Sequence, residues 1–232
     1  MKNNRRSFLA CFFSLACLAG VNSVFAETPA DNKKTEEVQV APQVILQTNM
    51  GDLRIELFPD KAPITVQNFL HYVDSGFYNG VIFHRIVPGF VVQGGGFDQE
   101  YQRKDTQAPI ANESDNRLKN LRGTLSMART FDPNSATSQF FINLKDNLQL
   151  DYRPGQPGYA VFGKLLDGLA VIDAMAEQPR GAHSGVFAEA PNKPIVIERA
   201  YRYHPETSKE EAPKSGAKEA PTKSKAVDTP KN

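Results

Sequence analysis

Cysteine is almost absent from this sequence. The 232 residues contain two, Cys11 and Cys17, and both lie close to the N-terminus. The chain that follows residue 26 therefore has no thiol. This absence excludes disulfides, a thiolate nucleophile and cysteine metal ligands from any domain formed by that part of the chain.

An excess of charge of either sign is also absent. The formal net charge of the whole chain is +1. Removal of an N-terminal segment that contains Lys2, Arg5 and Arg6 and no acidic residue would change it to −2. Neither value favours electrostatic binding to nucleic acid or to an anionic membrane, so neither partner is expected.

Long apolar runs are missing apart from one short run at the N-terminus. Residues 8–21 are mostly apolar, follow three basic residues, and precede Val24-Phe25-Ala26, which fits the pattern that a signal peptidase reads. The run is shorter than the roughly 18 residues that a spanning helix needs, and no later stretch approaches that length. We therefore expect residues 1–26 to be a cleavable signal peptide, and we expect no stable membrane insertion.

The route of export has two interpretations. Arg5-Arg6-Ser7-Phe8-Leu9 fits a twin-arginine signal as well as an ordinary secretory signal. The ordinary Sec route is favoured because nothing downstream suggests a cofactor that is loaded before export. Either route takes the protein out of the cytoplasm.

The remaining sequence divides by composition into a linker, one domain and a tail. Residues 27–40 are polar and charged without an apolar period, as in a flexible linker. Residues 205–232 have almost no large apolar side chain, so they cannot bury enough surface to offset the entropy of ordering, and a disordered charged tail is expected. Residues 41–204 are long enough for one substantial core and are interpreted as a single domain.

Two helices are predicted within this domain. Pro63 suits the first turn of a helix, apolar residues follow at 66, 69, 70 and 73, and Gly76 ends the pattern. A second helix is expected over residues 169–178, with Leu169, Ile172 and either Met175 or Ala176 facing inward and Pro179 ending it.

Short strands account for most of the remaining domain. Residues 44–48 and 53–57 flank a turn-rich tetrad and predict a hairpin. Further strands are expected at residues 81–87, 90–93, 124–128, 138–144, 159–165 and 195–203. Strands this closely spaced leave no room for helical crossovers, so the sheet should be mainly antiparallel, and closure into a barrel would protect its edges.

Several kinds of active site are not indicated by the motifs. The four histidines show no metal-ligand spacing, and His84 is best read as structural, so no metal is expected. Residues 94–96 are three glycines without a Walker lysine or a dinucleotide-binding frame. Ser126 and Ser138 lie outside any G-x-S-x-G elbow.

One face of the strand predicted at residues 81–87 carries a cation among apolar side chains. The two-residue period of a strand places Phe83, Arg85 and Val87 on one face and the residues between them on the other. After the turn that follows, Phe90 and Gln93 can return to the neighbourhood of Arg85. The sequence shows no acid, cysteine or phosphate loop nearby that would work with this arginine.

A second stretch has the same character. In residues 138–143, Gln139 and Phe141 share one face, while Phe140 and Ile142 share the other, which suits the core. An amide beside an exposed phenyl ring is an unfavourable surface unless something binds there. The face that carries Gln139 and Phe141 is therefore a candidate binding surface.

At these stretches the sequence resembles the cyclophilin family of peptidyl-prolyl cis–trans isomerases. The resemblance covers about residues 44–203. It implies a mainly β fold, a closed eight-stranded antiparallel barrel capped by two helices, with a proline-binding groove on the outer surface and no cofactor. The matching motifs are Phe83-His84-Arg85-Ile86, Pro88-Gly89-Phe90, Gln93-Gly94-Gly95, Ser126-Met127-Ala128, Ser138-Gln139-Phe140-Phe141-Ile142 and Val161-Phe162-Gly163.

The resemblance also implies roles for single residues. Arg85 would be the catalytic cation, with Gln93 holding a substrate carbonyl and Phe90 completing the catalytic group. The remaining substrate-binding residues would be Val91, Phe141 and Leu150 in the proline pocket, and Ala128, Arg129, Thr130, Gln139 and Tyr159 along the groove.

Three departures from the family pattern affect the groove. Gln149 stands where many members carry an aromatic residue, Tyr159 where many carry histidine, and Arg129-Thr130 replaces Asn-Ala. The missing aromatic at Gln149 should weaken cyclosporin binding more than catalysis.

The expected partners are unfolded or flexible proline-containing polypeptides. The signal and the compact loops resemble the exported bacterial branch, so we expect a periplasmic monomer. Two alternatives remain: a proline-peptide-binding holdase that needs little turnover, and a β-barrel carrier of a small ligand, which bulky interior residues disfavour.

Overall fold

The computed structural model describes residues 41–183 and 187–204. The predicted signal peptide, linker and charged tail lie outside the described residues. Within them the chain forms eleven strands, two α-helices and one short 3₁₀ helix. In chain order these are β1 (Gln43–Thr48), β2 (Gly51–Leu57), α1 (Pro63–Asp74), β3 (Val81–Ile82), β4 (Arg85–Val87), β5 (Val91–Gly94), β6 (Thr124–Met127), β7 (Phe140–Asn143), η1 (Leu148–Leu150), β8 (Val161–Asp167), α2 (Leu169–Ala176), β9 (Arg180–His183), β10 (Phe187–Pro191) and β11 (Val196–Arg202).

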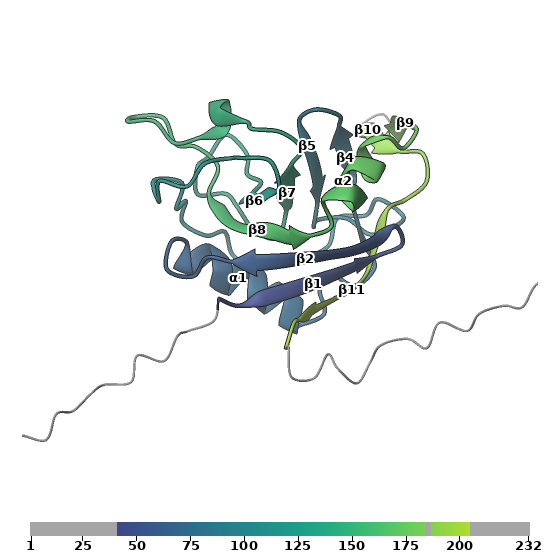
Figure 1. Cartoon of the computed structure of the whole chain (residues 1–232), viewed down its shortest axis with the longest axis horizontal. Helices are drawn as coiled ribbons and strands as arrows, with labels where there is room; N and C mark the ends of the chain where they lie inside the picture. The colour runs from purple at the N-terminus through teal and green to yellow at the C-terminus, as the bar shows by residue number, and fades with distance from the viewer. Residues whose placement is uncertain (1–40, 184–186, 205–232) are drawn as a thin grey trace, which may run out of the picture. The chain divides into compact units, whose positions relative to one another are not determined.

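Nine of these strands form one curled antiparallel sheet, which Figure 1 shows. Their order is β3-β11-β1-β2-β8-β6-β7-β5-β4. The first two strands form the predicted hairpin, in which Thr48 pairs with Gly51 across a two-residue loop. The prediction of a mainly β, antiparallel fold with two helices is confirmed.

The two edge strands of the sheet are consecutive in the chain. β3 pairs with β11 and β4 pairs with β5, and only Phe83 and His84 separate them. The prediction of one continuous strand over residues 81–87 is therefore wrong at Phe83 and His84, because the chain changes partner strand there. Counted as two halves of one strand, β3 and β4 bring the sheet to the predicted eight strands.

This interruption also changes which residues share a face. Phe83 and Ile86 are both buried in the main core, whereas His84 packs in a separate aromatic contact with Phe97. The prediction that Phe83 shares a face with Arg85 is wrong, because the two-residue period restarts after the break. At the crossing, Gly94 leaves room for the Phe83 ring, since a Cβ there would lie 2.8 Å from it.

Helix α1 forms and packs as its sequence predicts. Its apolar positions at 66, 69, 70 and 73 are buried in the main core. Ala62 supplies no side-chain cap, and the Glu113 carboxylate instead accepts hydrogen bonds from the main-chain N–H groups of Ile64 (3.0 Å) and Thr65 (2.8 Å). These bonds satisfy free donors of the first turn and place a negative charge at the positive end of the helix.

Helix α2 is shorter than predicted and exposes one residue that was expected inside. It ends at Ala176, with Glu177 as its C-cap, because Pro179 disfavours helical geometry at the residue before it. Ile172 and Met175 are fully buried as predicted, but Leu169 is 45% exposed.

The interior of the curled sheet is filled by aromatic side chains. The Phe69 ring lies 5.3 Å from Tyr78, 5.5 Å from Phe140 and 5.1 Å from Phe162. All four are fully buried, and each such side chain contributes about 2 kcal/mol or more through burial alone. This packed interior removes the support for a small-ligand carrier.

A second, two-stranded sheet was not predicted. β9 and β10 come from a stretch rich in Gly and Ala without a clear two-residue period. β10 packs beside the main sheet through Ala190, which is buried with Ile82 of β3, and through Phe187, whose ring lies 4.9 Å from Phe97 in the segment that follows β5. No helix of the described residues is long and apolar enough to cross a membrane.

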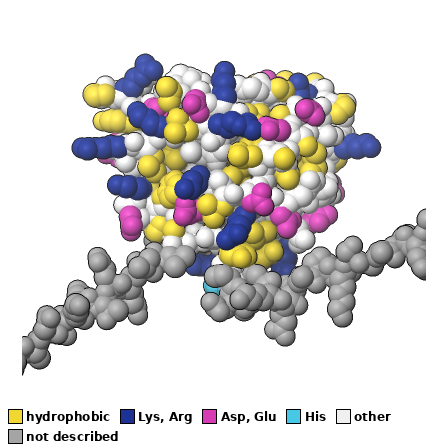
Figure 2. All heavy atoms as spheres, viewed as in Figure 1, with side chains coloured by type: hydrophobic (Ala, Val, Ile, Leu, Met, Phe, Trp, Pro, Cys, Tyr) yellow, Lys and Arg dark blue, Asp and Glu magenta, His cyan; other side chains and the backbone are white. Residues whose placement is uncertain are grey.

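The face of the described domain seen in Figure 2 carries charged side chains of both signs. On the face seen in Figure 2, basic and acidic side chains alternate with apolar ones rather than forming a patch of one sign. This distribution agrees with the near-neutral net charge of the sequence.

Candidate functional site

Strand register places three of the predicted site residues in one row. Arg85 of β4 pairs with Gln93 of β5, and Gln93 pairs in turn with Phe141 of β7. Residues that are directly opposite one another on neighbouring strands point to the same side of a sheet. The row lies on the outer side, because Ile86, Val92 and Ile142, the next residues along these strands, are buried in the main core.

A hollow of about 100 Å³ lies over this row. Its floor is apolar, since Val91 is 2% and Phe141 is 4% exposed. The Tyr159 ring meets Phe141 edge-on at 5.5 Å and forms part of the wall. The complete lining is Arg85, Phe90, Val91, Gln93, Ala128, Arg129, Phe141, Leu150 and Tyr159.

A second hollow, of about 180 Å³, shares part of its lining with the first. It is lined by Gln93, Arg103, Ala128, Arg129, Thr130, Ser135, Thr137 and Gln139. All eleven site residues named from the sequence therefore line one hollow or the other. Arg103, Ser135 and Thr137 were missed, although the two-residue spacing of 135, 137 and 139 offered a signal for two of them.

Polar contacts connect the cation to both hollows. Arg85 Nη1 lies 3.5 Å from Gln93 Oε1, and Gln93 Nε2 donates to Gln139 Oε1 at 3.2 Å. The Arg85 side chain is 39% exposed, so it lies on the surface rather than in the packed interior of the curled sheet. Its Nε forms an ion pair at 3.0 Å with Glu189 of β10, a residue for which the sequence gave no signal.

Arg129 and Tyr159, two residues that depart from the family pattern, contact each other. The Arg129 guanidinium stacks on the Tyr159 ring with 4.5 Å between its Cζ and the ring centroid. Arg129 also donates to the carbonyls of Pro157 (2.8 Å), Gly158 (3.2 Å) and Thr130 (2.9 Å). The arginine is thus tied into the wall between the hollows.

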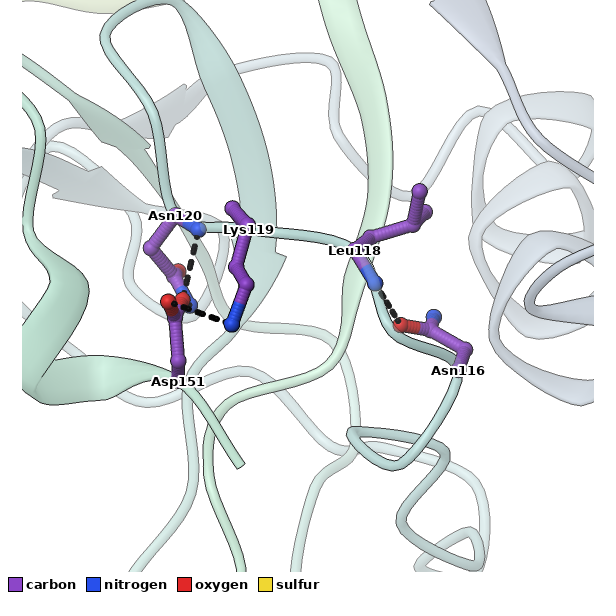
Figure 3. Close-up of polar contacts among 5 residues, drawn as sticks. All are labelled: Asn116, Leu118, Lys119, Asn120 and Asp151. Carbon is purple, nitrogen blue, oxygen red and sulfur yellow. Dashed lines mark hydrogen bonds and ion pairs between the residues drawn. The ribbon is translucent and has the colours of Figure 1, made fainter. Parts of the chain in front are cut away.

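A buried polar network supports the rim that carries Leu150. The Asp151 carboxylate accepts from the main-chain N–H of Asn120 at 2.8 Å and from its Nδ2 at 3.1 Å, and lies 3.4 Å from Lys119 Nζ, as Figure 3 shows. Asn147 extends the support by donating to the Phe90 carbonyl at 2.9 Å. The same view shows Asn116 accepting from the N–H of Leu118, which stabilises the turn before Lys119.

His84 lies beside the site but has a different environment from Arg85. It is 5% exposed, and its Nδ1 has no hydrogen-bond partner among the described residues. Burial, and to a smaller extent the positive charge of Arg85, lower the pKa of His84 from 6.5 to about 4. A neutral ring that packs on Phe97 fits the structural role predicted for it, and the described residues contain no cluster of potential metal ligands.

We expect His84→Phe to reduce the loss of stability at acidic pH. Folded His84 stays neutral down to about pH 4, whereas in the unfolded chain it binds a proton near pH 6.5. The wild-type free energy of unfolding should therefore be highest above pH 6.5 and lose about 3 kcal/mol through this group as the pH falls through 4. Urea unfolding of both proteins over this range measures the difference, and parallel curves would contradict the expectation.

Comparisons with known proteins agree with this geometry. The model of the family described as "Cyclophilin type peptidyl-prolyl cis-trans isomerase/CLD" matches residues 43–202. Peptidyl-prolyl cis-trans isomerase A of Dickeya dadantii is 48% identical over 186 residues, which are 80% of this chain and 95% of that protein. Peptidyl-prolyl cis-trans isomerase B of Escherichia coli is 48% identical over 159 residues, 67% of this chain and 96% of that protein.

A solved structure shows the same fold. The cyclophilin-type isomerase of Cryptosporidium parvum, determined in the presence of the dipeptide Ala-Pro, has a TM-score of 0.61 and 32% sequence identity, and covers 70% of this chain and 99% of that chain. The family model spans more than half of the sequence, and the two bacterial relatives are matched over nearly their whole length. The chain therefore belongs to the cyclophilin family and is a peptidyl-prolyl cis–trans isomerase.

Proposed function

We propose that this isomerase accelerates rotation about X–Pro bonds by hydrogen bonding from Arg85 to the prolyl nitrogen in the twisted state. The planar amide has partial double-bond character and a rotation barrier of about 18–20 kcal/mol. Rotation through about 90° breaks the resonance and leaves a lone pair on nitrogen. A donor aimed at this nitrogen stabilises the transition state and not the planar ground state, which is the requirement for catalysis.

The observation that carries the proposal is the row of Arg85, Gln93 and Phe141 beneath an apolar hollow of about 100 Å³. Phe141 and its apolar neighbours offer a seat for the proline ring, and Gln93 can hold a substrate carbonyl while the preceding carbonyl turns. Arginine stays protonated and has a planar, directional fork, so it suits the donor role. No covalent bond needs to be made or broken in this reaction.

The interactions proposed for Arg85, Gln93 and the apolar hollow are strong enough for the rate acceleration that catalysis requires. An acceleration of about 10⁵-fold corresponds to roughly 7 kcal/mol of preferential transition-state binding. One charged donor contributes about 3–4 kcal/mol in comparable sites. The apolar seat, the held carbonyl and the exclusion of water from the twisted bond supply the remainder.

We propose that the substrates are unfolded or flexible proline-containing segments of exported proteins in the periplasm. Support comes from the N-terminal sequence pattern of residues 1–26 and from the position of both hollows on the outer side of the sheet, where an extended chain can lie across them. The bonds to be turned exchange in about 10–100 s without catalysis, slowly enough to limit the folding of such proteins.

Exchange NMR of an Ala-Pro peptide tests the proposal directly. We expect catalytic amounts of the protein to raise the cis–trans exchange rate far above the uncatalysed value, and the same peptide with Pro replaced by Ala to cause much weaker shifts of the Phe141 resonances. The holdase alternative expects saturable binding without faster exchange. That outcome would contradict the proposal.

A further inference from the structure

We propose that Glu189 is a positioning residue for Arg85, and this inference rests on the catalytic role proposed for Arg85. The Glu189 carboxylate lies 3.0 Å from Nε in an ion pair. Among the described residues it is the one carboxylate within ion-pair distance of this guanidinium. Nothing in the sequence around Arg85 supplies such a partner, because Glu189 belongs to β10, which lies far from Arg85 along the chain.

The two contacts of the guanidinium engage different nitrogens. Glu189 attracts Nε at 3.0 Å, and Gln93 Oε1 lies 3.5 Å from Nη1. Because both contacts act on one rigid, planar group, together they restrict where the guanidinium can lie. The described residues make no hydrogen bond to Nη2, which leaves that group to serve a ligand in the hollow.

Restraint matters here because the arginine is half-exposed. A long side chain with 39% exposure has many rotamers available and loses direction without partners. The ion pair is itself 41% exposed on the Glu189 side, so solvent screens it and leaves much of the guanidinium's charge available to a substrate. The contact therefore affects orientation more than it neutralises charge.

Glu189 is held in place by two neighbours in its own strand, one partly buried and one fully buried. Phe187, two residues before it, contacts the His84 ring at 5.9 Å and the Tyr101 ring at 5.0 Å. Ala190, directly after it, is 1% exposed. His84 is also the residue before Arg85, so the strands that carry the two charges are locked together next to the ion pair.

The effect of the charge is tested with Glu189→Gln, which keeps the length of the side chain. We expect kcat for an X–Pro peptide to fall about three- to fivefold, the ratio that an exposed ion pair at the upper end of its usual strength can produce, with KM little changed. Glu189→Asp keeps the charge and should restore part of kcat. Glu198→Gln is the matched control, because Glu198 is an exposed acid of β11, and it should leave both constants unchanged.

Salt provides a readout that a purely structural role would not change. The screening length falls from about 10 Å at 0.1 M to about 3 Å at 1 M ionic strength. Wild-type kcat should therefore decrease with added NaCl toward the value of Glu189→Gln, whereas kcat of Glu189→Gln should not respond. Unchanged or increased kcat in Glu189→Gln would overturn the proposal.

The double variant Arg85→Ala/Glu189→Gln separates the two hypotheses. It should have the same activity as Arg85→Ala alone, because Glu189 acts only through the guanidinium. If Arg85→Ala is inactive and Glu189→Gln equals the wild type, the positioning role fails and the catalytic role stands. If Arg85→Ala keeps its activity, the proposed mechanism itself fails.

Discussion

Arg85→Ala is expected to lower kcat/KM for X–Pro isomerisation by about 100- to 1,000-fold, the usual effect of removing one transition-state donor. The loss should appear mainly in kcat, because the apolar seat formed around Phe141 remains and still binds the proline ring. The free energy of unfolding should change by less than about 1 kcal/mol, since the lost ion pair with Glu189 is about 40% exposed on both sides. Exchange NMR and urea unfolding measure the two quantities.

Two further variants show whether charge or geometry is responsible. Arg85→Lys keeps the charge but loses the planar fork, so its activity should lie between those of the wild type and Arg85→Ala. Arg199→Ala removes an exposed arginine that stacks on Tyr201 outside both hollows, and it should leave activity unchanged. If Arg85→Ala keeps more than half of the wild-type kcat/KM, the donor mechanism is wrong.

The parts of the fold that could be predicted are those in which local pattern and tertiary packing agree. The hairpin of β1 and β2 and the buried stripe of α1 both follow from short-range spacing. The break at Phe83 and His84 could not be predicted, because residues 81–87 contain no Gly or Pro that would signal it, and only the change of partner strand from β11 to β5 shows where it lies. The exposed Leu169 has a related cause, since the side that α2 presents to the sheet is set by tertiary contacts.

The site residues that could be predicted are those that lie in motifs shared with the cyclophilin family. Arg85, Gln93 and Phe141 belong to separate segments; the family resemblance implied that they share one site, but their arrangement in one row depends on strand register, which only the structure provides. Glu189 was missed because β10 shows no clear strand pattern, and its pairing with Arg85 arises from a contact between two sheets. The roles of these residues, the monomeric state and weak cyclosporin binding remain predictions.

Asp151→Ala is expected to destabilise the domain by about 4 kcal/mol. The carboxylate oxygen Oδ1 accepts from both the main-chain N–H and the Nδ2 of Asn120, which is fully buried. Removal of this oxygen leaves two buried donors unsatisfied, each costing about 1–3 kcal/mol. For a domain of this size the change corresponds to a decrease in Tm of roughly 10 °C, which differential scanning calorimetry measures.

Asp151→Asn distinguishes the hydrogen bonds from the charge. The asparagine keeps an oxygen for Asn120 and loses only the ion pair with Lys119, whose side chain is 56% exposed, so the cost should be less than about 1 kcal/mol. Lys119→Met should be equally mild. If Asp151→Asn is as unstable as Asp151→Ala, the charge rather than the acceptor oxygen stabilises this network.

The same substitution should also affect the active site. Leu150 lines the proline hollow and directly precedes Asp151, while Asn147 connects this rim to the Phe90 carbonyl. Below its Tm, Asp151→Ala should therefore raise KM several-fold with a smaller change in kcat, because the apolar seat loosens while Arg85 and Gln93 keep their register. If kcat instead falls by the same factor as KM rises, the rim that carries Leu150 and the row of Arg85, Gln93 and Phe141 depend on each other. That outcome would contradict the structure, in which different contacts stabilise the rim and the row.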